Sequence, residues 1–306
     1  MQQTLKTDVK LLGIGLHSGR PARLCIKPGP AGHGIVFRRV DIRDRCADIK
    51  ARFDNVTDTR LNTTIENADG AVVSTIEHLM AALAGCGIHN ALIEIDGPEV
   101  PIFDGSSHPF VRALLAAGIA ETPAELTVLR VAKPIQVTRG DAMAELVPFD
   151  GFEIDYAIAF ADAAIGEQAL CLDLQNGAFL RELSDCRTFC RQDDVAMMQQ
   201  SGLALGGTYE NAVVVDGARV LSPGGFRRDF ECVRHKMLDA LGDLALAGAP
   251  ILGRYRAVRG GHALTNVLLR AAMAEPGALV RISADADCAA RLPGMRLTHQ
   301  DFAAVI

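Results

Sequence analysis

Two short polar clusters carry the side chains that could do chemistry. His235 and Asp239 are four residues apart, so a helix would present both on one face, where they could ligate a single cation. A second segment places Glu77 directly before His78. Two histidines and an aspartate make three protein ligands, the number that a catalytic zinc uses when its fourth position is left for water. Glu77 could then take a proton from that water, so the sequence predicts a zinc hydrolase.

Each of these residues also has an ordinary structural interpretation. A His–Asp pair at helical spacing also occurs as a plain surface pair. Ser74 and Glu77 fit the capping-box pattern, in which the Glu side chain folds back onto the backbone N–H of the Ser. His262 follows two glycines and could simply begin a helix, while Lys236 and Asp243 could be polar helix residues. The residues alone leave both interpretations open.

Hydrophobic periodicity predicts the helices and strands that position these side chains. Pro109 in a first turn marks one helix start, and Gly248 followed by Pro250 marks one helix end. A mixture of strands and helices joined by short links predicts an α+β fold. Helices are expected over 75–84, 108–117, 231–247 and 262–273, and strands over 22–26, 34–37, 91–95, 126–131, 153–159, 212–215 and 278–282.

The chain is long enough for two domains. Its 306 residues are 49% hydrophobic and 22% charged, which is typical of a globular protein. A polar, proline-marked link over 118–125 predicts domains at 1–120 and 126–306. Both candidate ligand helices share a His-x-Met pattern with a glycine seven residues after the His. A duplicated domain with the metal at the interface would produce this similarity.

Charge, targeting and cysteine patterns exclude several classes of protein. The net charge of −6 argues against general nucleic-acid binding. No signal-peptide pattern and no apolar run of about 18 residues is present, so stable membrane insertion is not expected. The eight cysteines lack CxxC spacing and are expected to be reduced, which indicates the cytoplasm. HExxH, GxSxG and phosphate-loop patterns are also missing.

Longer motifs carry a resemblance to a known family. The chain reads Ser-Thr-Ile-Glu-His-Leu-Met-Ala-Ala-Leu-Ala-Gly around His78 and Arg-His-Lys-Met-Leu-Asp around His235. In order and nearly end to end, it closely resembles the zinc-dependent UDP-3-O-acyl-N-acetylglucosamine deacetylases of bacterial lipid A synthesis. The other segments that carry the resemblance are Gly13–Gly19, Pro101–Ser107, Arg187–Phe189, Gly202–Gly207 and Gly261–Leu264.

This resemblance implies a fold and a set of chemical roles. It implies two similar α+β domains, each a small sheet packed against helices, with the active site at the domain interface. One zinc ion per chain would be held by His78, His235 and Asp239. Glu77 would be the general base and His262 the general acid.

Further roles follow from the same resemblance. Asp243 would orient His262 or balance its charge. Thr188 and Lys236 match positions that support the reacting carbonyl and the substrate. The remaining substrate contacts are expected at Leu61, Phe189 and Arg259.

The implied substrate is an amphiphile, UDP-3-O-(3-hydroxyacyl)-N-acetylglucosamine, which would lose acetate and leave a free amine. Asp185-Cys186 and Cys190 flank the Arg-Thr-Phe motif and depart from the family pattern, which bears on acyl-chain length. Arg259 stands where a Lys often binds the diphosphate, so the positive charge is kept. The segment between Thr188 and Gly207 matches an insert that encloses the acyl chain, and its expected lining is Ala196, Met197, Met198, Leu203 and Leu205.

Two other functions stay open. The chain could be a zinc amidohydrolase with a different N-acyl substrate, which a substrate panel would reveal. It could also be a silent UDP-lipid-binding protein, although the complete set of candidate catalytic and ligand residues argues against that. The expected partner is the small-molecule substrate, with no nucleic acid, and the chain is expected to be a monomer. Zinc and iron both remain candidates for the metal used in cells.

Overall fold

The first half of the chain builds a five-stranded sheet. The computed structural model describes residues 1–295, 297 and 301, so the end of the second predicted domain, 302–306, lies outside the described residues. Buried and exposed side chains alternate along the central strands, as a sheet with one covered face requires. The strand order is β2 (Val9–Ile14), β3 (Pro21–Pro28), β9 (Ala91–Ile95), β4 (Ile35–Arg39) and β5 (Asp48–Lys50), with only β4 and β9 parallel.

Two helices and a small sheet complete this half. Helix α1 (Glu77–Gly85) is apolar on nearly every side and almost entirely buried, as expected for a helix inside a core. Helix α2 (His108–Ala117) packs beside it, and the Ser107 hydroxyl donates to His78 O at 2.7 Å. A 3-10 turn (Phe53–Asn55) leads into a three-stranded sheet of β6 (Val56–Asp58), β7 (Thr64–Glu66) and β8 (Val72–Val73).

The second half is built on a larger sheet. Strand β19 (Ile251–Val258) is central and contacts three other strands. No strand was expected there from the sequence, because its alternation is interrupted by Gly253 and by charged residues. Around β19 lie β12 (Ile135–Arg139), β13 (Ala142–Val147), β11 (Thr127–Val131), β20 (Leu279–Ser283), β14 (Phe152–Ala159) and β15 (Glu167–Asp173).

Helices of this half position the candidate site. Helix α5 (Glu231–Leu244) continues as a 3-10 turn (Ala245–Ala247) and ends at Gly248, as predicted. Helix α6 (His262–Ala274) begins at His262 itself. The remaining elements are α3 (Ala178–Glu182), β16 (Phe189–Arg191), α4 (Gln192–Gln200), β17 (Val213–Asp216), β18 (Arg219–Val220) and α7 (Ala286–Ala289).

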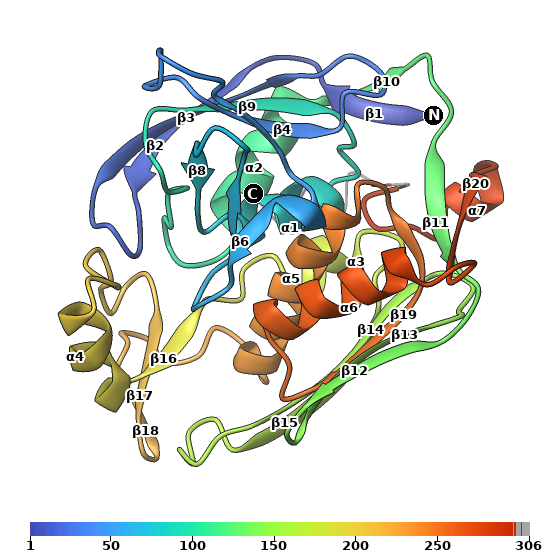
Figure 1. The fold of residues 1–306 in the computed structure, drawn as a ribbon. Helices are drawn as coiled ribbons and strands as arrows, with labels where there is room; N and C mark the ends of the chain where they lie inside the picture. The colour runs from blue at the N-terminus through green and yellow to red at the C-terminus, as the bar shows by residue number, and fades with distance from the viewer. Residues whose placement is uncertain (296, 298–300, 302–306) are drawn as a thin grey trace.

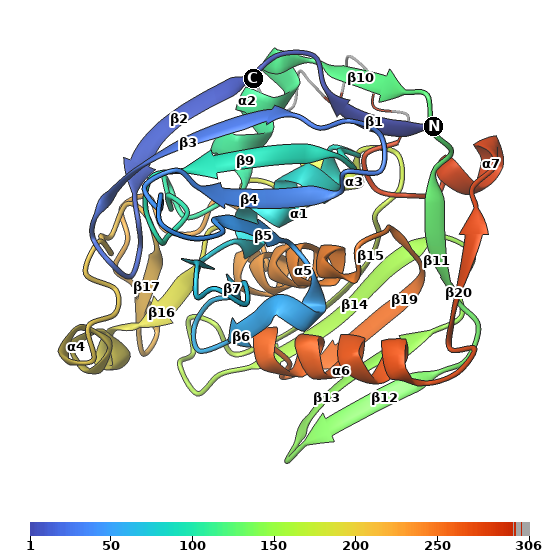
Figure 2. The same ribbon diagram turned by 45° about the horizontal axis from the view of Figure 1, so that its top comes forward.

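The two larger sheets enclose a layer of helices. Figure 2 shows α1 and α5 between the sheet that contains β3 and β9 and the sheet that contains β14 and β19. The helices approach closely at Gly242, where a Cβ would lie 2.1 Å from the carbonyl oxygen of Glu77. Segregated helices and largely antiparallel sheets confirm the predicted α+β class.

The junction between the halves differs from the expected link. Within 118–125, β10 (Ile119–Thr122) forms an antiparallel pair with β1 (Gln2–Leu5) at the very start of the chain (Figure 1). The predicted link is therefore partly a strand, because its residues find backbone partners far away in sequence. The domain bounds 1–120 and 126–306 stay a prediction. Within the described part of the chain, no helix is long and apolar enough to cross a membrane.

Candidate metal centre and active site

Three predicted ligands meet where α1 and α5 pack together. His78 is the second residue of α1, and His235 and Asp239 lie one turn apart on α5. One ligand atom from each lies within 4.8 Å of the others, and all three side chains are buried. Asp239 Oδ1 is 3.5 Å from His78 Nε2 and 3.3 Å from His235 Nε2. The structure thus brings together residues from both halves of the chain.

The donor atoms fit a tetrahedral metal ion. Bonds of about 2.0–2.1 Å from a tetrahedral zinc put its ligand atoms about 3.3 Å from one another. The observed 3.3 and 3.5 Å separations match that requirement. Asp239 Oδ1 is also buried without a hydrogen-bond partner among the described residues. A buried carboxylate oxygen without a partner is costly, and a cation between it and the two imidazoles would remove that cost.

The neighbours of His235 and Asp239 prepare both side chains for a cation. His235 Nδ1 lies 3.0 Å from the carbonyl oxygen of Cys186, which can only accept, so Nδ1 carries the proton and Nε2 has a free electron pair. Burial lowers the pKa of His235 to about 3, which keeps the ring neutral. Lys236 Nζ donates to Asp239 Oδ2 at 2.6 Å and leaves Oδ1 for the metal.

Glu77 does not form the capping box that its sequence pattern allows. Ser74 lies outside α1 and donates its hydroxyl to Pro98 O, and Ile76 occupies the N-cap position. Glu77 Oε2 instead accepts the backbone N–H of Thr63 at 3.0 Å. The capping interpretation is therefore wrong. Burial raises the pKa of the Glu77 carboxyl, against the opposing effects of His262 and His78.

Asp243 and His262 form a second buried pair beside the ligands. His262 Nδ1 donates to Asp243 Oδ2 at 2.8 Å, and His262 Nε2 lies 3.9 Å from Asp239 Oδ2. Burial acts to lower the pKa of His262, but the charge and hydrogen bond of Asp243 outweigh it and raise the pKa to about 9. The protonated imidazole is thus held beside the predicted metal ligands.

The Arg-Thr-Phe motif lies against the same site. Thr188 N donates to Gly105 O, and Val213 N donates to Thr188 O, both at 2.8 Å. A Cβ on Gly105 would lie 2.1 Å from the carbonyl oxygen of Asn211, so a glycine is required for this close contact. The Phe189 ring stands edge-on to His235 with centroids 6.3 Å apart. These contacts bring two motifs that are distant in sequence, Pro101–Ser107 and Arg187–Phe189, together beside the site.

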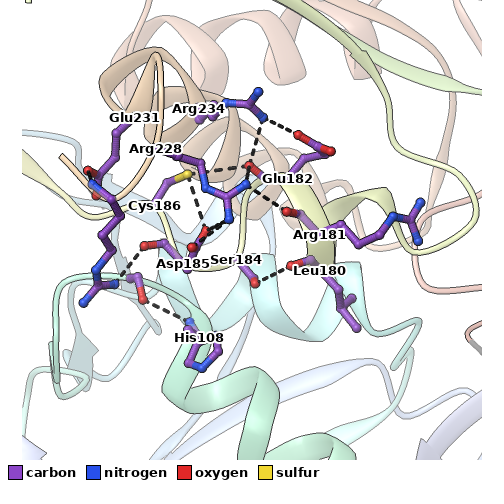
Figure 3. A network of polar contacts seen from close by, with 12 residues as sticks. His108, Leu180, Arg181, Glu182, Ser184, Asp185, Cys186, Arg228, Glu231 and Arg234 are labelled. Carbon is purple, nitrogen blue, oxygen red and sulfur yellow. Dashed lines mark hydrogen bonds and ion pairs between the residues drawn. The ribbon is translucent and has the colours of Figure 1, made fainter. Parts of the chain in front are cut away.

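A polar network fixes the segment before Thr188 to the start of α5. Arg187 donates to Glu231 through its backbone and side chain, and both side chains are buried. Figure 3 shows Asp185 beside Arg228 and Cys186 close to Glu182. Asp185-Cys186, a departure from the family pattern, therefore forms the turn whose carbonyl orients His235. Their effect on acyl-chain length, and that of Cys190, stay predictions.

Two predicted substrate-binding residues lie outside the buried cluster. Leu61 is 54% exposed and adopts a positive φ of 64° in the loop before Thr63. Arg259 is exposed, and its guanidinium pairs with Asp141. Among the contacts of the described residues, none joins Leu61 or Arg259 to the predicted metal ligands. Their roles in substrate binding stay predictions.

The predicted acyl passage is held by contacts from the first half of the chain. Leu205 N donates to His17 O at 3.1 Å, and Gly206 N donates to Leu16 O at 2.9 Å. His17 N in turn donates to the buried carboxylate of Glu99 at 2.7 Å. The predicted lining residues are half-buried or exposed, with Met197 at 61%. An enclosed passage stays a prediction.

One cavity of the structure is separate from these residues. Its volume is about 400 Å³, and it lies at the opposite ends of α1 and α5, lined in part by Ile88, His89 and Leu244. None of the candidate site residues lines it. This cavity therefore does not coincide with the buried ligand cluster.

Sequence reasoning missed two residues that hold the site together. Thr63 contacts both Glu77 and Asp243, and Cys186 contacts His235 through its backbone. A threonine in a polar loop and a carbonyl oxygen have no spacing pattern that predicts such contacts. The only signal for Thr63 was its position close to the predicted contact Leu61.

Known proteins are similar to this chain over nearly its whole length. The family described as UDP-3-O-acyl N-acetylglycosamine deacetylase matches residues 2–274. The UDP-3-O-acyl-N-acetylglucosamine deacetylase of Idiomarina loihiensis is 49% identical over 279 residues, covering 90% of this chain and 91% of that protein. The enzyme of the same name from Phenylobacterium zucineum is 47% identical over 277 residues, covering 90% of this chain and 94% of that protein. With this identity over nearly its whole length, the chain belongs to the UDP-3-O-acyl N-acetylglycosamine deacetylase family.

Proposed function

We propose that this chain is a zinc-dependent hydrolase that removes the N-acetyl group from UDP-3-O-(3-hydroxyacyl)-N-acetylglucosamine in lipid A biosynthesis. The observation that carries the proposal is the buried group of His78, His235 and Asp239, in which Asp239 Oδ1 lies 3.5 and 3.3 Å from the two imidazole nitrogens, with Glu77 next to His78 in the chain. The identity of the substrate is inferred from membership of a family of deacetylases. The products are acetate and the free amine.

The reaction needs activation of both water and amide, because an amide is a weak electrophile. A bound zinc would lower the pKa of its water towards about 7 and polarise the acetyl carbonyl. Glu77 takes the proton of the attacking water. Thr188 and the positive charge of Lys236 support the oxygen on which negative charge develops.

The leaving nitrogen needs a proton before it can depart as an amine. His262 Nε2 gives that proton, because Nδ1 is occupied by Asp243. Asp243 also keeps the ring in one orientation and stabilises its charged form. The high pKa of His262 keeps it protonated near neutral pH, as a general acid requires.

Substrate binding divides between a charged and an apolar end. Arg259 supplies positive charge for the diphosphate and would exchange Asp141 for a phosphate oxygen. Leu61 and Phe189 contact the sugar and acyl regions. The segment from 192 to 207 receives the acyl chain, whose alkyl groups suit its methionines.

Acetate release from purified protein tests the proposal. Activity on UDP-3-O-acyl-N-acetylglucosamine is expected to disappear after chelation and to return when zinc is added. His235→Ala is expected to bind no zinc and to stay inactive. A folded, zinc-loaded protein that releases no acetate would contradict the proposed substrate.

A substrate panel separates this function from that of another zinc amidohydrolase. Removing the 3-O-acyl group is expected to lower kcat/KM sharply, because the passage then has no alkyl chain to bind. Equal rates with and without that group would favour a different N-acyl substrate.

The free cysteines are in line with a reducing cytoplasm. The monomeric state stays a prediction.

A further inference from the structure

Thr63 uses all of its polar groups inside the site. It is 2% exposed and lies in the loop between β6 and β7. Its backbone N–H donates to Glu77 Oε2 at 3.0 Å, and its carbonyl accepts from Ile76 N at 3.4 Å. Its hydroxyl donates to Asp243 Oδ1 at 2.6 Å, across 180 residues of sequence. The residue therefore joins the start of α1 to the polar end of the His–Asp pair.

These contacts form one continuous chain of hydrogen bonds. It runs from Glu77 through Thr63 and Asp243 to His262, whose Nδ1 is 2.8 Å from Asp243 Oδ2. An ionised carboxylate can only accept, so the hydroxyl proton of Thr63 must point at Asp243. The chain links the proposed general base to the proposed general acid without passing through the metal ligands.

The hydrogen bond from the Thr63 hydroxyl limits how the Asp243 carboxylate can move. With Oδ1 bound by Thr63 and Oδ2 by His262, rotation of the carboxylate would break two charge-assisted hydrogen bonds. The His262 ring is therefore fixed with Nδ1 protonated, and Nε2 faces the ligand cluster. The orientation of His262, the proposed general acid, therefore depends on the Thr63 hydroxyl, which acts through Asp243.

The hydrogen bond from the backbone N–H of Thr63 acts on the Glu77 carboxylate in the same way. The N–H of Thr63 donates to Oε2 and so restricts rotation of the carboxylate that is to take the water proton. A side-chain substitution at Thr63 keeps this N–H. The hydroxyl contact with Asp243 can therefore be tested separately from the backbone contact with Glu77.

We propose that Thr63 is a positioning residue that sets the general base Glu77 and the Asp243–His262 pair relative to one another. The inference rests on the proposed deacetylase function for the roles of those groups. The position requires a hydroxyl on a buried backbone that also donates its N–H. Serine can meet both requirements, and valine only the second.

Three variants test the hydrogen bond from the Thr63 hydroxyl to Asp243. Thr63→Val keeps the shape and removes the donor, and Thr63→Ser keeps the donor. Thr64→Val is the matched control, because the hydroxyl of the neighbouring Thr64 donates to Asn62 Oδ1 at 2.8 Å, outside the contacts with Glu77 and Asp243. We expect Thr63→Val to lower kcat by about 10- to 100-fold, the effect of losing a hydrogen bond to a charged group. KM and one zinc per chain should be retained, and Thr63→Ser and Thr64→Val should stay within about threefold of the original kcat.

A spectroscopic measurement gives a readout besides activity. The Nδ1 proton of His262, assigned by NMR with His262→Gln, should move upfield and exchange faster with water in Thr63→Val. It should be unchanged in Thr64→Val. If the unaltered protein releases no acetate, the proposed function fails while this signal still tests the hydroxyl contact.

Two results would overturn the inference. One is a Thr63→Val variant with unchanged kcat and an unchanged His262 resonance. The other is a Thr63→Ser variant as impaired as Thr63→Val, because serine keeps the hydroxyl donor and the loss of activity would then not follow the hydroxyl.

Discussion

Asp239 divides its two oxygens between two kinds of neighbour. Oδ2 accepts from the ammonium of Lys236, and Oδ1 faces the Nε2 atoms of His78 and His235. The carbonyl of Cys186 fixes the tautomer of His235, so its electron pair also faces inward. The free electron pair of His235 Nε2 and the Oδ1 atom of Asp239, 3.3 Å apart, would repel each other without a cation. At the scale of residues, this is the physical basis for expecting a metal.

Replacing Glu77 separates proton transfer from metal binding. Glu77→Gln keeps the size of the side chain and an oxygen that can accept from Thr63, but it cannot take a proton. We expect kcat to fall by about 10²- to 10⁴-fold, the usual contribution of a general base. Acetate release and zinc content measured on one preparation check this, with zinc retained. Full activity of the variant would remove Glu77 from the base role.

The site exists only where α1 and α5 are in contact. His78 comes from one helix and the other two ligands from the second, so the separation of the helices sets the ligand geometry. That separation depends on Gly242, which lies against the backbone of Glu77. Arg187 and Glu231 hold the Thr188 segment to the beginning of α5. At the scale of elements, close helix packing and one buried ion pair therefore assemble the site.

Adding one methyl group at the helix contact should disturb the whole site. Gly242→Ala would force a Cβ to within 2.1 Å of Glu77 O, so the helices must move apart. We expect a loss of about 1–3 kcal/mol in unfolding free energy. Zinc affinity should also weaken, because the ligands separate with the helices. Denaturant unfolding and competition with a chelator measure the two effects.

Gly97→Ala is the matched control for that substitution. Its nearest neighbour would be the Cβ of Ala22 at 3.8 Å, an ordinary contact. Both stability and zinc affinity should stay close to those of the unaltered protein. A Gly242→Ala variant that behaves like this control would show that the helix contact tolerates a larger separation.

Contacts between distant segments hold the whole molecule together. The start of the chain closes onto the junction between the halves through β1 and β10. The same strand reaches the end of α1, where Gln3 N donates to His89 Nδ1 at 2.9 Å. That imidazole nitrogen must be unprotonated to accept. Burial, helped by the charge of the N-terminus, lowers the pKa of His89 to about 4.

Stability should therefore fall in mildly acidic solution. The folded pKa of about 4 lies below the model-peptide value of 6.5, so between these pH values the unfolded chain binds a proton that the folded chain does not. The His89 contribution is complete above pH 6.5 and decreases as pH falls towards 4. We expect it to amount to up to about 3 kcal/mol.

His89→Gln isolates this contribution, because its amide oxygen can accept from Gln3 N and does not titrate. Unfolding free energies of both proteins between pH 7 and pH 4 should converge as the pH falls. Parallel curves for the two proteins would show that His89 does not titrate in this range.

Local sequence patterns predicted helices better than strands. The expected helix over 108–117 has the same bounds in the structure, and that over 262–273 is extended by one residue. Their periodicity and start signals lie within a few residues of one another. Strands β12, β13 and β19 were missed, since partly exposed residues and Gly253 obscure their alternation. A strand depends on partners that its own sequence does not contain.

The sequence by itself determined the α+β class, the family and the residue types of the predicted metal ligands. His235 and Asp239 meet through helical spacing alone, a local property of the chain. Only the tertiary structure decided that Glu77 bonds Thr63 and does not cap its helix, and that Cys186 O orients His235. The reason is physical. Backbone N–H and C=O groups are the same at every residue, so only the folded chain decides which of them meet the side chains of the site.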